Sequence, residues 1–347
     1  MSLTTDVRTP GIQPSGGAGD ALLEVSGLTV EYASAGAPTR ACSDISFTLG
    51  RGEILGVVGE SGSGKSTLIT ALTRLQRPPA VTTAGSIRYR PRDRGEAIDL
   101  VTLTPKALRG LRWTRMSIVL QSAMDALNPV MRLGAQFVDV LRTHDRRMSR
   151  AAAWDEARRL LGLVGISADR VRSYPHELSG GMRQRATIAL ALACRPELIV
   201  MDEPTTAVDV VMQRQILAQV LRLRREFGFA VVFVTHDLSL LLELADRIAV
   251  MYGGRIVELA PARDVYHSPR HPYTKGLRDS FPPLHATSTR LEGIPGTPPD
   301  LRALPPGCAF ADRCPAVMDR CRTELPLLQP VGDTIVACHL HDEEVPA

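Results

Sequence analysis

The sequence predicts an α/β fold, and two observations lead to this prediction. Strands expected at residues 54–58, 198–201 and 230–234 are apolar throughout, as parallel strands buried on both faces of a sheet should be. The first of them leads into a glycine-rich loop at residues 59–67, which opens an expected helix at residues 68–75. A strand, a glycine-rich loop and a helix in this order make a phosphate-binding unit. A nucleoside triphosphate is therefore the expected ligand.

Other segments surround this core. Alternating apolar and polar residues predict short antiparallel strands at residues 23–32, 45–49 and 86–89. Strands at residues 248–252 and 255–259 flank two glycines, which is a hairpin signal. A helix is expected over 149–164, because its apolar residues share one helical face: Ala153, Ala157, Leu160, Leu161 and Val164.

The glycine-rich loop reads Gly-Glu-Ser-Gly-Ser-Gly-Lys-Ser-Thr. Its glycines let backbone N–H groups turn inward around phosphate oxygens, and the helix N-terminus adds positive potential. Lys65 is expected to reach the outer phosphates, and Ser66 to hold Mg²⁺. The loop residues expected to bind nucleotide are Gly59, Ser61, Gly62, Ser63, Gly64, Lys65, Ser66 and Thr67.

A second motif narrows the class. Residues 178–185 read Leu-Ser-Gly-Gly-Met-Arg-Gln-Arg and precede the strand that ends in Asp202 and Glu203. With these residues the chain resembles the ATPase subunit of an ATP-binding cassette (ABC) transporter. The resemblance implies a RecA-like P-loop ATPase core with an antiparallel β subdomain and a helical subdomain. The residues that match the family's signature are Ser179, Gly180, Gly181 and Gln184.

The resemblance also implies roles for single residues. Asp202 would support Mg²⁺, Glu203 would activate the attacking water, and His236 would contact the terminal phosphate. Gln121 resembles the family's Q-loop glutamine, and Tyr32 the aromatic residue that stacks on adenine. The Mg²⁺ ligands implied are Ser66, Gln121 and Asp202, and the catalytic residues are Lys65, Glu203 and His236. Residues 206–209, ending in Asp209, resemble the D-loop with valine where leucine is commoner.

Each single residue also has a structural interpretation. Tyr32 follows Leu28 and Val30 in an alternating strand, so it is also a candidate core residue. The two acids that end the strand at residue 203 would otherwise form an ion-paired cap. Gln121 would otherwise lie at a solvated strand end, and His236 would be structural.

One chain does not complete the site in the family that this sequence resembles. There, ATP lies between the phosphate-binding loop of one cassette and the signature of another, here Ser179 and Gly181. Dimerisation is therefore an implied part of the mechanism. Because Glu203, His236 and the signature are intact, nothing indicates a degenerate cassette.

Net charge and hydropathy limit the classes of partner that the sequence predicts. The 41 Lys and Arg against 37 Asp and Glu give +4, which is too small to argue for nucleic acid. Arginine clusters at residues 109–115 and 142–150 are expected to be solvated faces or subunit contacts. No apolar h-region marks a signal peptide in residues 1–20, and charges interrupt the apolar stretch at 238–251. The chain is expected to be cytoplasmic.

The expected organisation has three parts. Residues 1–20 would be a disordered tail, 21–260 the ABC nucleotide-binding domain with its helical subdomain at about 122–180, and 261–347 a C-terminal extension. No internal repeat is visible, so one cassette is expected.

The extension carries four of the six cysteines: Cys308, Cys314, Cys321 and Cys338. A reducing cytoplasm shifts the expectation from disulfides toward metal binding. Their spacing matches neither the usual zinc pairs nor ferredoxin runs, so spacing alone does not name a metal. The remaining two, Cys42 and Cys194, are expected to be inert core residues.

Further segments extend the resemblance. Residues 271–277 (His-Pro-Tyr-Thr-Lys-Gly-Leu), 293–296, 305–310 and 313–315 are similar to the C-terminal extension of the oligopeptide/dipeptide ATPase subfamily. In that subfamily the four cysteines are implied to hold a 4Fe-4S cluster in some members. Zinc, free thiols and disulfides remain alternatives, and His339 and His341 are possible substitute ligands. A structural role, fastening a proline-rich segment, is expected.

The sequence is therefore interpreted as the ATP-hydrolysing subunit of a bacterial peptide importer at the cytoplasmic face of the plasma membrane. The implied partners are a sister ABC ATPase, two transmembrane permease subunits and an extracytoplasmic substrate-binding protein. Residues 122–134 would meet the permease, although Met124, Leu127 and Met131 also suit packing in the helical subdomain. Alternatives are import of nickel, glutathione or another small solute, or a non-transport ABC ATPase acting on ribosomes or DNA.

Overall fold

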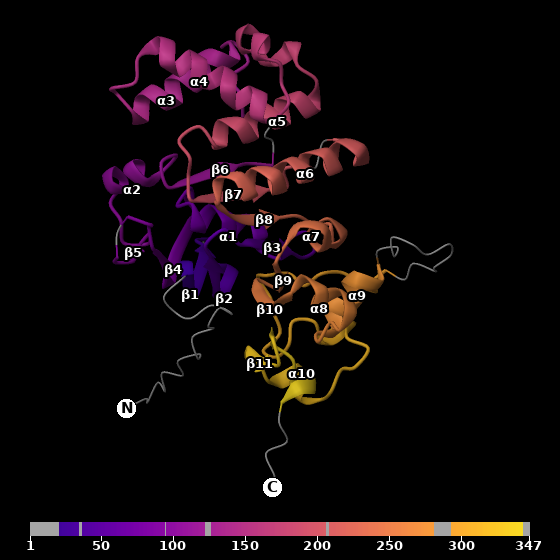
Figure 1. The fold of residues 1–347 in the computed structure, drawn as a ribbon. Helices are drawn as coiled ribbons and strands as arrows, with labels where there is room; N and C mark the ends of the chain where they lie inside the picture. The colour runs from indigo at the N-terminus through magenta and orange to yellow at the C-terminus, as the bar shows by residue number, and fades with distance from the viewer. Residues whose placement is uncertain are drawn as a thin grey trace.

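The computed structural model describes residues 21–34, 37–93, 95–121, 126–205, 208–280 and 293–342. A helical layer lies at one end of the molecule, the sheets lie in the middle, and the C-terminal extension lies at the other end (Figure 1). The predicted tail at residues 1–20 falls outside the described residues, as do residues 122–125, 206 and 207.

Two sheets form the middle of the molecule. The antiparallel sheet has the order β2-β1-β4-β5, and the larger mixed sheet has the order β11-β12-β10-β9-β3-β8-β7-β6. The strands of the antiparallel sheet are β1 (Ala21–Tyr32), β2 (Thr39–Gly50), β4 (Ala80–Tyr89) and β5 (Ile98–Asp99). Those of the mixed sheet are β3 (Ile54–Val58), β6 (Met116–Val119), β7 (Leu198–Asp202), β8 (Ala230–Val234), β9 (Arg247–Tyr252), β10 (Arg255–Pro261), β11 (Gln329–Val331) and β12 (Thr334–Val336).

Helices cover the mixed sheet and build the two ends of the molecule. The α-helices are α1 (Lys65–Leu72), α2 (Pro105–Leu111), α3 (Leu133–His144), α4 (Arg150–Leu163), α5 (Gly180–Ala191), α6 (Val210–Phe227), α7 (Leu238–Leu244), α8 (Ala262–His267), α9 (Pro272–Asp279) and α10 (Arg320–Thr323). Short 3₁₀ helices are η1 (Ala168–Arg172), η2 (Pro175–Glu177), η3 (Ala311–Arg313) and η4 (His339–His341).

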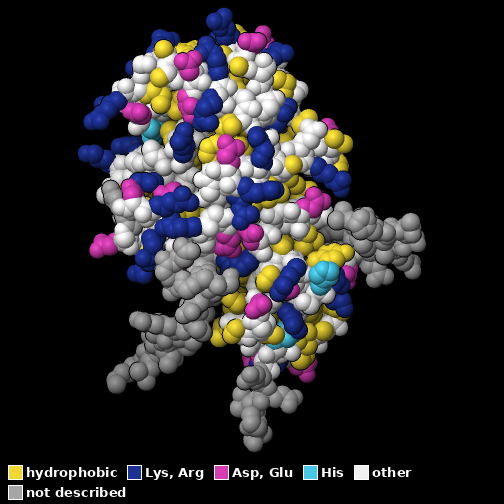
Figure 2. Space-filling view, viewed as in Figure 1, with side chains coloured by type: hydrophobic (Ala, Val, Ile, Leu, Met, Phe, Trp, Pro, Cys, Tyr) yellow, Lys and Arg dark blue, Asp and Glu magenta, His cyan; other side chains and the backbone are white. Residues whose placement is uncertain are grey.

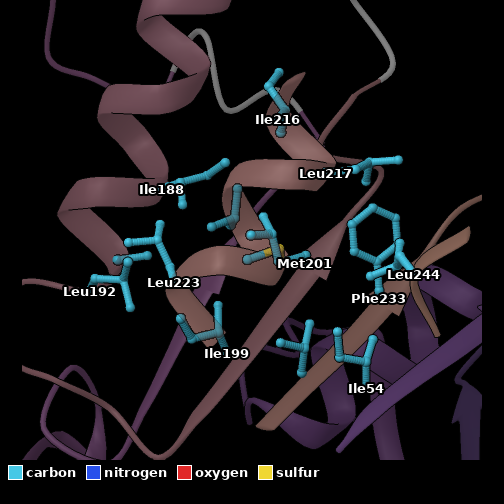
Figure 3. Close-up of a cluster of buried hydrophobic side chains, with 14 of the residues drawn as sticks. Ile54, Ile188, Leu192, Ile199, Met201, Ile216, Leu217, Leu223, Phe233 and Leu244 are labelled. Carbon is cyan, nitrogen blue, oxygen red and sulfur yellow. The ribbon is translucent and has the colours of Figure 1, made fainter. Parts of the chain in front are cut away.

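Side chains of the central strands alternate between two hydrophobic cores. Along β7, Ile199 and Met201 face the core that contains the helices, whereas Leu198 and Val200 face the core shared with α1 and the antiparallel sheet. Because both faces are covered, β3, β8 and the first four residues of β7 are apolar throughout, as predicted. Figure 3 shows the helical side, where α5, α6 and α7 pack on the strands through Ile188, Leu192, Ile216, Leu217, Leu223 and Leu244.

The helical layer is built from α3, α4, η1, η2 and α5 (Figure 1). The predicted helix at residues 149–164 is confirmed as α4, and the Ser149 side chain caps it by accepting from the N–H of Ala152. Its apolar positions are buried as predicted: Ala153, Ala157, Leu160 and Leu161, with Val164 at the C-cap. The predicted solvated arginines of this layer are exposed: Arg142, Arg146, Arg147 and Arg150. Figure 2 shows Lys and Arg side chains interspersed with Asp and Glu over the visible face of the molecule.

The C-terminal extension continues the mixed sheet. β9 and β10 form the predicted hairpin around two glycines, and β12 pairs antiparallel with β10 on its outer edge. The carboxylate of Glu258 on β10 is fully buried and accepts the N–H groups of Arg270 and His271 at 2.9 and 2.8 Å. These bonds fasten the segment between α8 and α9 to the sheet, so the extension packs on the mixed sheet.

Among the described residues, every helix is too short or too polar to cross a lipid bilayer.

Candidate functional site: a phosphate-binding loop at a sheet edge

The glycine-rich loop, Gln121, Asp202, Glu203 and His236 lie at one edge of the mixed sheet. Strands β3, β8, β7 and β6 are neighbours and run parallel, so their carboxyl ends meet at that edge. In open α/β sheets ligands bind outside these strand ends. β3 leads to the glycine-rich loop, β6 to Gln121, β7 to Glu203 and β8 to His236. Topology therefore brings together residues that are far apart in the sequence.

Neighbouring backbone fixes the shape of the glycine-rich loop. Gly64 is the N-cap of α1 and has a left-handed backbone with φ of 101°. A Cβ atom there would overlap the carbonyl oxygen of Ala41 on β2, and one at Gly59 would overlap that of Met251 on β9. Only glycine is compatible with these approaches. The loop is thereby held as a tight cradle in front of the α1 N-terminus, which suits an anion.

Lys65 is folded into the loop that precedes it. Its Nζ donates to the carbonyl oxygens of Gly59 at 2.6 Å and Glu60 at 2.9 Å, and lies 3.4 Å from Ser63 Oγ. Burial lowers the pKa of Lys65, and nearby carboxylates, led by Glu203, oppose that shift. A cation positioned this way can exchange carbonyl oxygens for phosphate oxygens with little rearrangement, so the residues present fit a triphosphate.

Glu203 lies at the centre of a polar cluster. Gln121 Nε2 donates to one carboxylate oxygen at 2.9 Å, and His236 Nδ1 lies 3.3 Å from the other. The backbone of Glu203 is left-handed, with φ of 43°, and its N–H donates to the carbonyl oxygen of Val234 at 2.8 Å. Such backbone conformations in non-glycine residues gather at functional sites. The structure thus places Glu203 against Gln121 and His236.

Asp202 ends β7 and is buried beside this cluster. Burial raises its pKa to about 6, the charge of Glu203 adds to the increase, and the ammonium of Lys65 opposes it. An ionised carboxylate in this position is costly unless a cation joins it. Oxygen donors from Ser66, Gln121 and Asp202 suit a hard cation such as Mg²⁺.

We expect Asp202→Asn to stabilise the nucleotide-free protein at pH 8 by roughly 2 kcal/mol, because the buried charge is removed. The carboxyl group of Asp202 ionises near pH 3.8 in the unfolded chain but only near pH 6 in the folded protein. The folded protein therefore loses stability as the pH rises from about 4 to about 6. The advantage of Asn should therefore be complete above pH 6 and disappear toward pH 4. Urea unfolding at several pH values measures this. An advantage that stays constant across the range would contradict the burial argument.

Tyr32 lies next to the helix that the loop opens. It is the last residue of β1 and is 36% exposed, so the alternative interpretation as a core residue is wrong. Its hydroxyl lies 3.1 Å from Thr67 Oγ1 on α1. An exposed ring beside the phosphate loop is available to stack on a base.

The signature residues lie in a different part of the molecule. Ser179 is the N-cap of α5, where its side chain accepts from the N–H of Met182 at 3.3 Å, and it is exposed. α5 packs on α4, α6 and β6, whereas α1 packs on β1, β2 and β7. Gly181 is packed so tightly that a Cβ would come within 2.6 Å of Met212 Sδ on α6. Gln184 is buried in the same helix.

Asp209 caps α6, and its side chain accepts from the N–H of Met212 at 2.9 Å. Of the D-loop segment, Thr206 and Ala207 lie outside the described residues.

The four cysteines of the extension converge on one small cavity. Cys308, Cys314, Cys321 and Cys338 all line a space of about 10 Å³, and each is a free thiol. Burial raises the pKa of Cys338 to about 11 and also raises those of Cys308 and Cys314. The thiols would have to lose their protons to bind a metal. In the part of the chain that the structure describes, no Cys, His, Asp or Glu group is arranged to hold a metal ion.

The histidines considered as substitute ligands are already engaged. His339 contacts Asp342 Oδ2 at 2.8 Å through Nδ1 and the carbonyl oxygen of Glu324 at 3.0 Å through Nε2. His341 Nε2 lies 3.0 Å from the carbonyl oxygen of Arg270. Both have structural partners.

Cys42 and Cys194 differ in their surroundings. Cys42 is fully buried, burial raises its pKa to about 12, and its Sγ lies 3.5 Å from the carbonyl oxygen of Gly64. Cys194 is half-buried, with a pKa raised to about 11. Cys42 is therefore a core residue as predicted, whereas Cys194 is not part of the core; in both, burial disfavours the thiolate form.

Two residues near the loop have no counterpart in the sequence prediction. The Tyr273 hydroxyl accepts the N–H of Glu60, and Arg313 forms an ion pair with the Glu60 carboxylate. Sequence separations of 213 and 253 residues leave no periodic signal for such contacts. The only hint was that both residues belong to the segments similar to the subfamily extension.

Comparisons with known proteins agree with this geometry. The ABC transporter family matches residues 42–206, and the family described as "Oligopeptide/dipeptide transporter, C-terminal region" matches residues 257–321. Among solved structures, the fold is similar to a dimeric ATP-binding cassette, MJ0796, bound to ADP and Pi, with a TM-score of 0.61 and 26% identity. That likeness covers 70% of this chain and 99% of the cassette.

Relatives with matching sequences extend over the C-terminal part as well. The chain is 42% identical to the oligopeptide transport ATP-binding protein OppD of Salmonella typhimurium, over 99% of this chain and all of that protein. It is 41% identical to the dipeptide transport ATP-binding protein DppD of Bacillus subtilis, over 93% of this chain and 95% of that protein. Since this likeness runs through both the cassette and the extension, the chain belongs to the family of ATP-binding subunits of oligopeptide and dipeptide ABC transporters.

Proposed function

We propose that this chain hydrolyses ATP to drive peptide uptake, as one ATPase subunit of a bacterial importer. The observation that carries the proposal is the cluster of Glu203, Gln121 and His236 beside the buried Lys65 in a chain of this family. Transport proteins among the relatives favour this function over a non-transport ABC ATPase, and their names favour peptides over nickel or glutathione.

The chain's own residues would divide the work of phosphoryl transfer to water. Lys65 and the loop N–H groups bind the phosphates and offset their charge. Glu203 orients the attacking water and accepts its proton, and Gln121 holds the carboxylate in place. His236 lies on the other side of Glu203, where it can contact the terminal phosphate. Mg²⁺, held by Ser66, Gln121 and Asp202, supplies charge neutralisation when bound.

A second cassette would complete each site. Ser179 is exposed at the N-terminus of α5, so the signature is free to meet nucleotide held by another chain. Ser179, Gly180, Gly181 and Asp209 would act at that interface, whereas Gln184 is buried and would support α5 from inside. Tyr32 would stack on adenine. A sister ATPase of the same family is the proposed second chain.

Membrane partners follow from the importer function. A peptide ABC importer requires permease subunits, and we propose two of them, with an extracytoplasmic substrate-binding protein and this chain at the cytoplasmic face. In the segment proposed to meet the permease, Leu127 is buried in the core and therefore serves packing, whereas Val130 is 81% exposed. Met124 lies outside the described residues.

Growth measures the function directly. A strain that lacks the gene should fail to grow with defined oligopeptides as its only source of a required amino acid, and the wild-type gene should restore growth. A gene carrying Glu203→Gln should not restore it. Normal peptide growth of the deletion strain, in the absence of a second peptide importer, would contradict peptide import.

The cysteine cavity is the proposed site of a 4Fe-4S cluster, with zinc as the alternative. Support comes from the donor set, since four free thiols line one space, and Cys₄ is the common ligand set of such clusters. The same four thiols are also the ligand set of a structural zinc site, so zinc stays the alternative. Its role would be to fasten the segments that contribute the cysteines.

Metal analysis of anaerobically purified protein tests the cluster. About four iron and four sulfide per chain are expected, with visible absorption that bleaches on reduction. Cys314→Ser should lose most of the iron, whereas Cys194→Ser, outside the cavity, should keep it. One zinc per chain without iron would contradict the cluster and support a zinc site. Protein purified without any metal would contradict both proposals.

A further inference from the structure

An arginine of the extension grips the phosphate-binding loop. Arg313, at the end of η3, contacts the Glu60 carboxylate through both guanidinium ends, with Nη1 to Oε2 at 2.6 Å and Nη2 to Oε1 at 3.0 Å. Its side chain is only 6% exposed. A bidentate pair with a buried guanidinium fixes direction as well as distance.

All five N–H donors of Arg313 have acceptors. Besides the two bonds to Glu60, Nη1 donates to Tyr252 Oη at 3.1 Å, Nη2 to the carbonyl oxygen of Ile294 at 3.3 Å, and Nε to that of Pro295 at 2.7 Å. The guanidinium carbon also lies 5.8 Å from the ring centres of Tyr252 and Phe310. The arginine is therefore held rigidly before it reaches the loop.

A second bond from the extension acts on the same loop residue. Tyr273, on α9 and fully buried, accepts the backbone N–H of Glu60 through its hydroxyl at 2.9 Å. Its ring packs against Tyr252 and Phe310, with ring centres 4.5 and 5.3 Å apart. Both the side chain and the backbone of Glu60 are thus fastened to residues outside the cassette core.

Glu60 in turn contacts Lys65, the residue proposed to bind phosphate. The carbonyl oxygens of Gly59 and Glu60 both accept from Lys65 Nζ. The Glu60 carboxylate is a negative charge within the electrostatic range of Lys65, and it would repel a triphosphate if it turned toward the loop. Arg313 compensates this charge and holds it away from the cradle.

We propose that Arg313 is a positioning residue for the phosphate-binding loop, through which the C-terminal extension sets the affinity of this chain for ATP. The inference rests on the proposed ATPase function and adds to it a contribution that the cassette core does not contain. It predicts that the extension is part of the nucleotide site and not only a covering for the sheet edge.

The test measures Kd for Mg·ATP directly, and KM and kcat separately. Arg313→Met keeps the aliphatic stem but leaves Glu60 without its partner, so Kd and KM should rise about tenfold while kcat at saturating ATP changes less than about threefold. Arg302→Ala, in the same extension, removes an exposed ion pair with Asp300 and is the matched control. It should behave as wild type.

Two further variants separate positioning from general damage. Combining Glu60→Gln with Arg313→Met removes both charges, and Kd should return to within about threefold of wild type, since an unpaired carboxylate causes most of the loss. Tyr273→Phe keeps the ring packing and should weaken ATP binding about threefold to fivefold. This variant provides a test even where Arg313→Met fails to fold.

Each outcome has a distinct meaning. Wild-type protein without Mg·ATP binding would contradict the proposed function itself. Wild-type binding together with unchanged Kd in folded Arg313→Met, or in Tyr273→Phe, would overturn the positioning role alone. The Kd of Glu60→Gln alone is measured as well. If the rise in Kd of the double variant equals the product of the rises in the two single variants, the positioning role is overturned too, because the two residues then act independently.

Discussion

A Glu203→Gln chain is expected to bind Mg·ATP about as well as wild type and to lose at least about a hundredfold in kcat. Gln has the size of Glu, and its side-chain oxygen still accepts the bond from Gln121 Nε2. The amide cannot take a proton from water, so only the chemical step is affected. A loss confined to kcat, with Kd unchanged, is the pattern of an interaction made in the transition state.

Nucleotide binding and steady-state hydrolysis measured on one preparation test this expectation. Glu243→Gln is the matched control, because it makes the same change on an exposed residue of α7. If the proposed pairing with a sister ATPase holds, blocked hydrolysis should also leave the two cassettes closed on ATP, which size-exclusion chromatography of the mixed subunits detects. Hydrolysis near the wild-type rate would remove Glu203 from the role of general base.

The sequence predicted the core of the site because strand ends and loops carry local signals. β8 runs over Ala230–Val234 as predicted, and His236 follows it directly. The apolar run that becomes β7 ends in two acids, and a parallel sheet leaves one place for all such ends. The family resemblance assigned Gln121, Glu203 and His236 to one site, and the order of the parallel strands explains why they lie together.

Local signals were weaker where pairing or capping decides the structure. The predicted helix begins at residue 68, whereas α1 begins at Lys65, because Gly64 forms the N-cap and the first turn is polar. The strand predicted at residues 86–89 is the end of a longer one, β4, which begins at Ala80. Its first half is largely exposed and is held by pairing with β1, so periodicity alone does not reveal it.

Contacts between the extension and the cassette could not be predicted at all. β11 and β12 have three residues each and form only by pairing beside β10. The bond from Arg313 to Glu60 joins a proline-rich segment to the glycine-rich loop. Neither segment carries a sequence pattern that predicts contact with the other. A long-range ion pair depends on the fold of all the residues between its two partners.

Lys65→Ala should weaken Mg·ATP binding by on the order of a hundredfold, the second large effect expected. Its ammonium now donates to two carbonyl oxygens of the loop, and bound phosphate offers it charged acceptors, whose hydrogen bonds are each worth about 1.5–3 kcal/mol. Burial already lowers the pKa of Lys65, so its charge is costly in the empty loop. Its removal should therefore change affinity far more than fold stability.

Comparing titration calorimetry with thermal unfolding separates the two effects. Lys106→Ala, on the exposed side of α2, removes one positive charge away from the loop and serves as the control. If nucleotide affinity fell only in proportion to lost stability, Lys65 would be a structural clamp for the carbonyl oxygens of Gly59 and Glu60. If affinity did not change, the loop would not be the phosphate site. A large loss of affinity in a chain that unfolds like wild type requires the ammonium to act on the ligand itself.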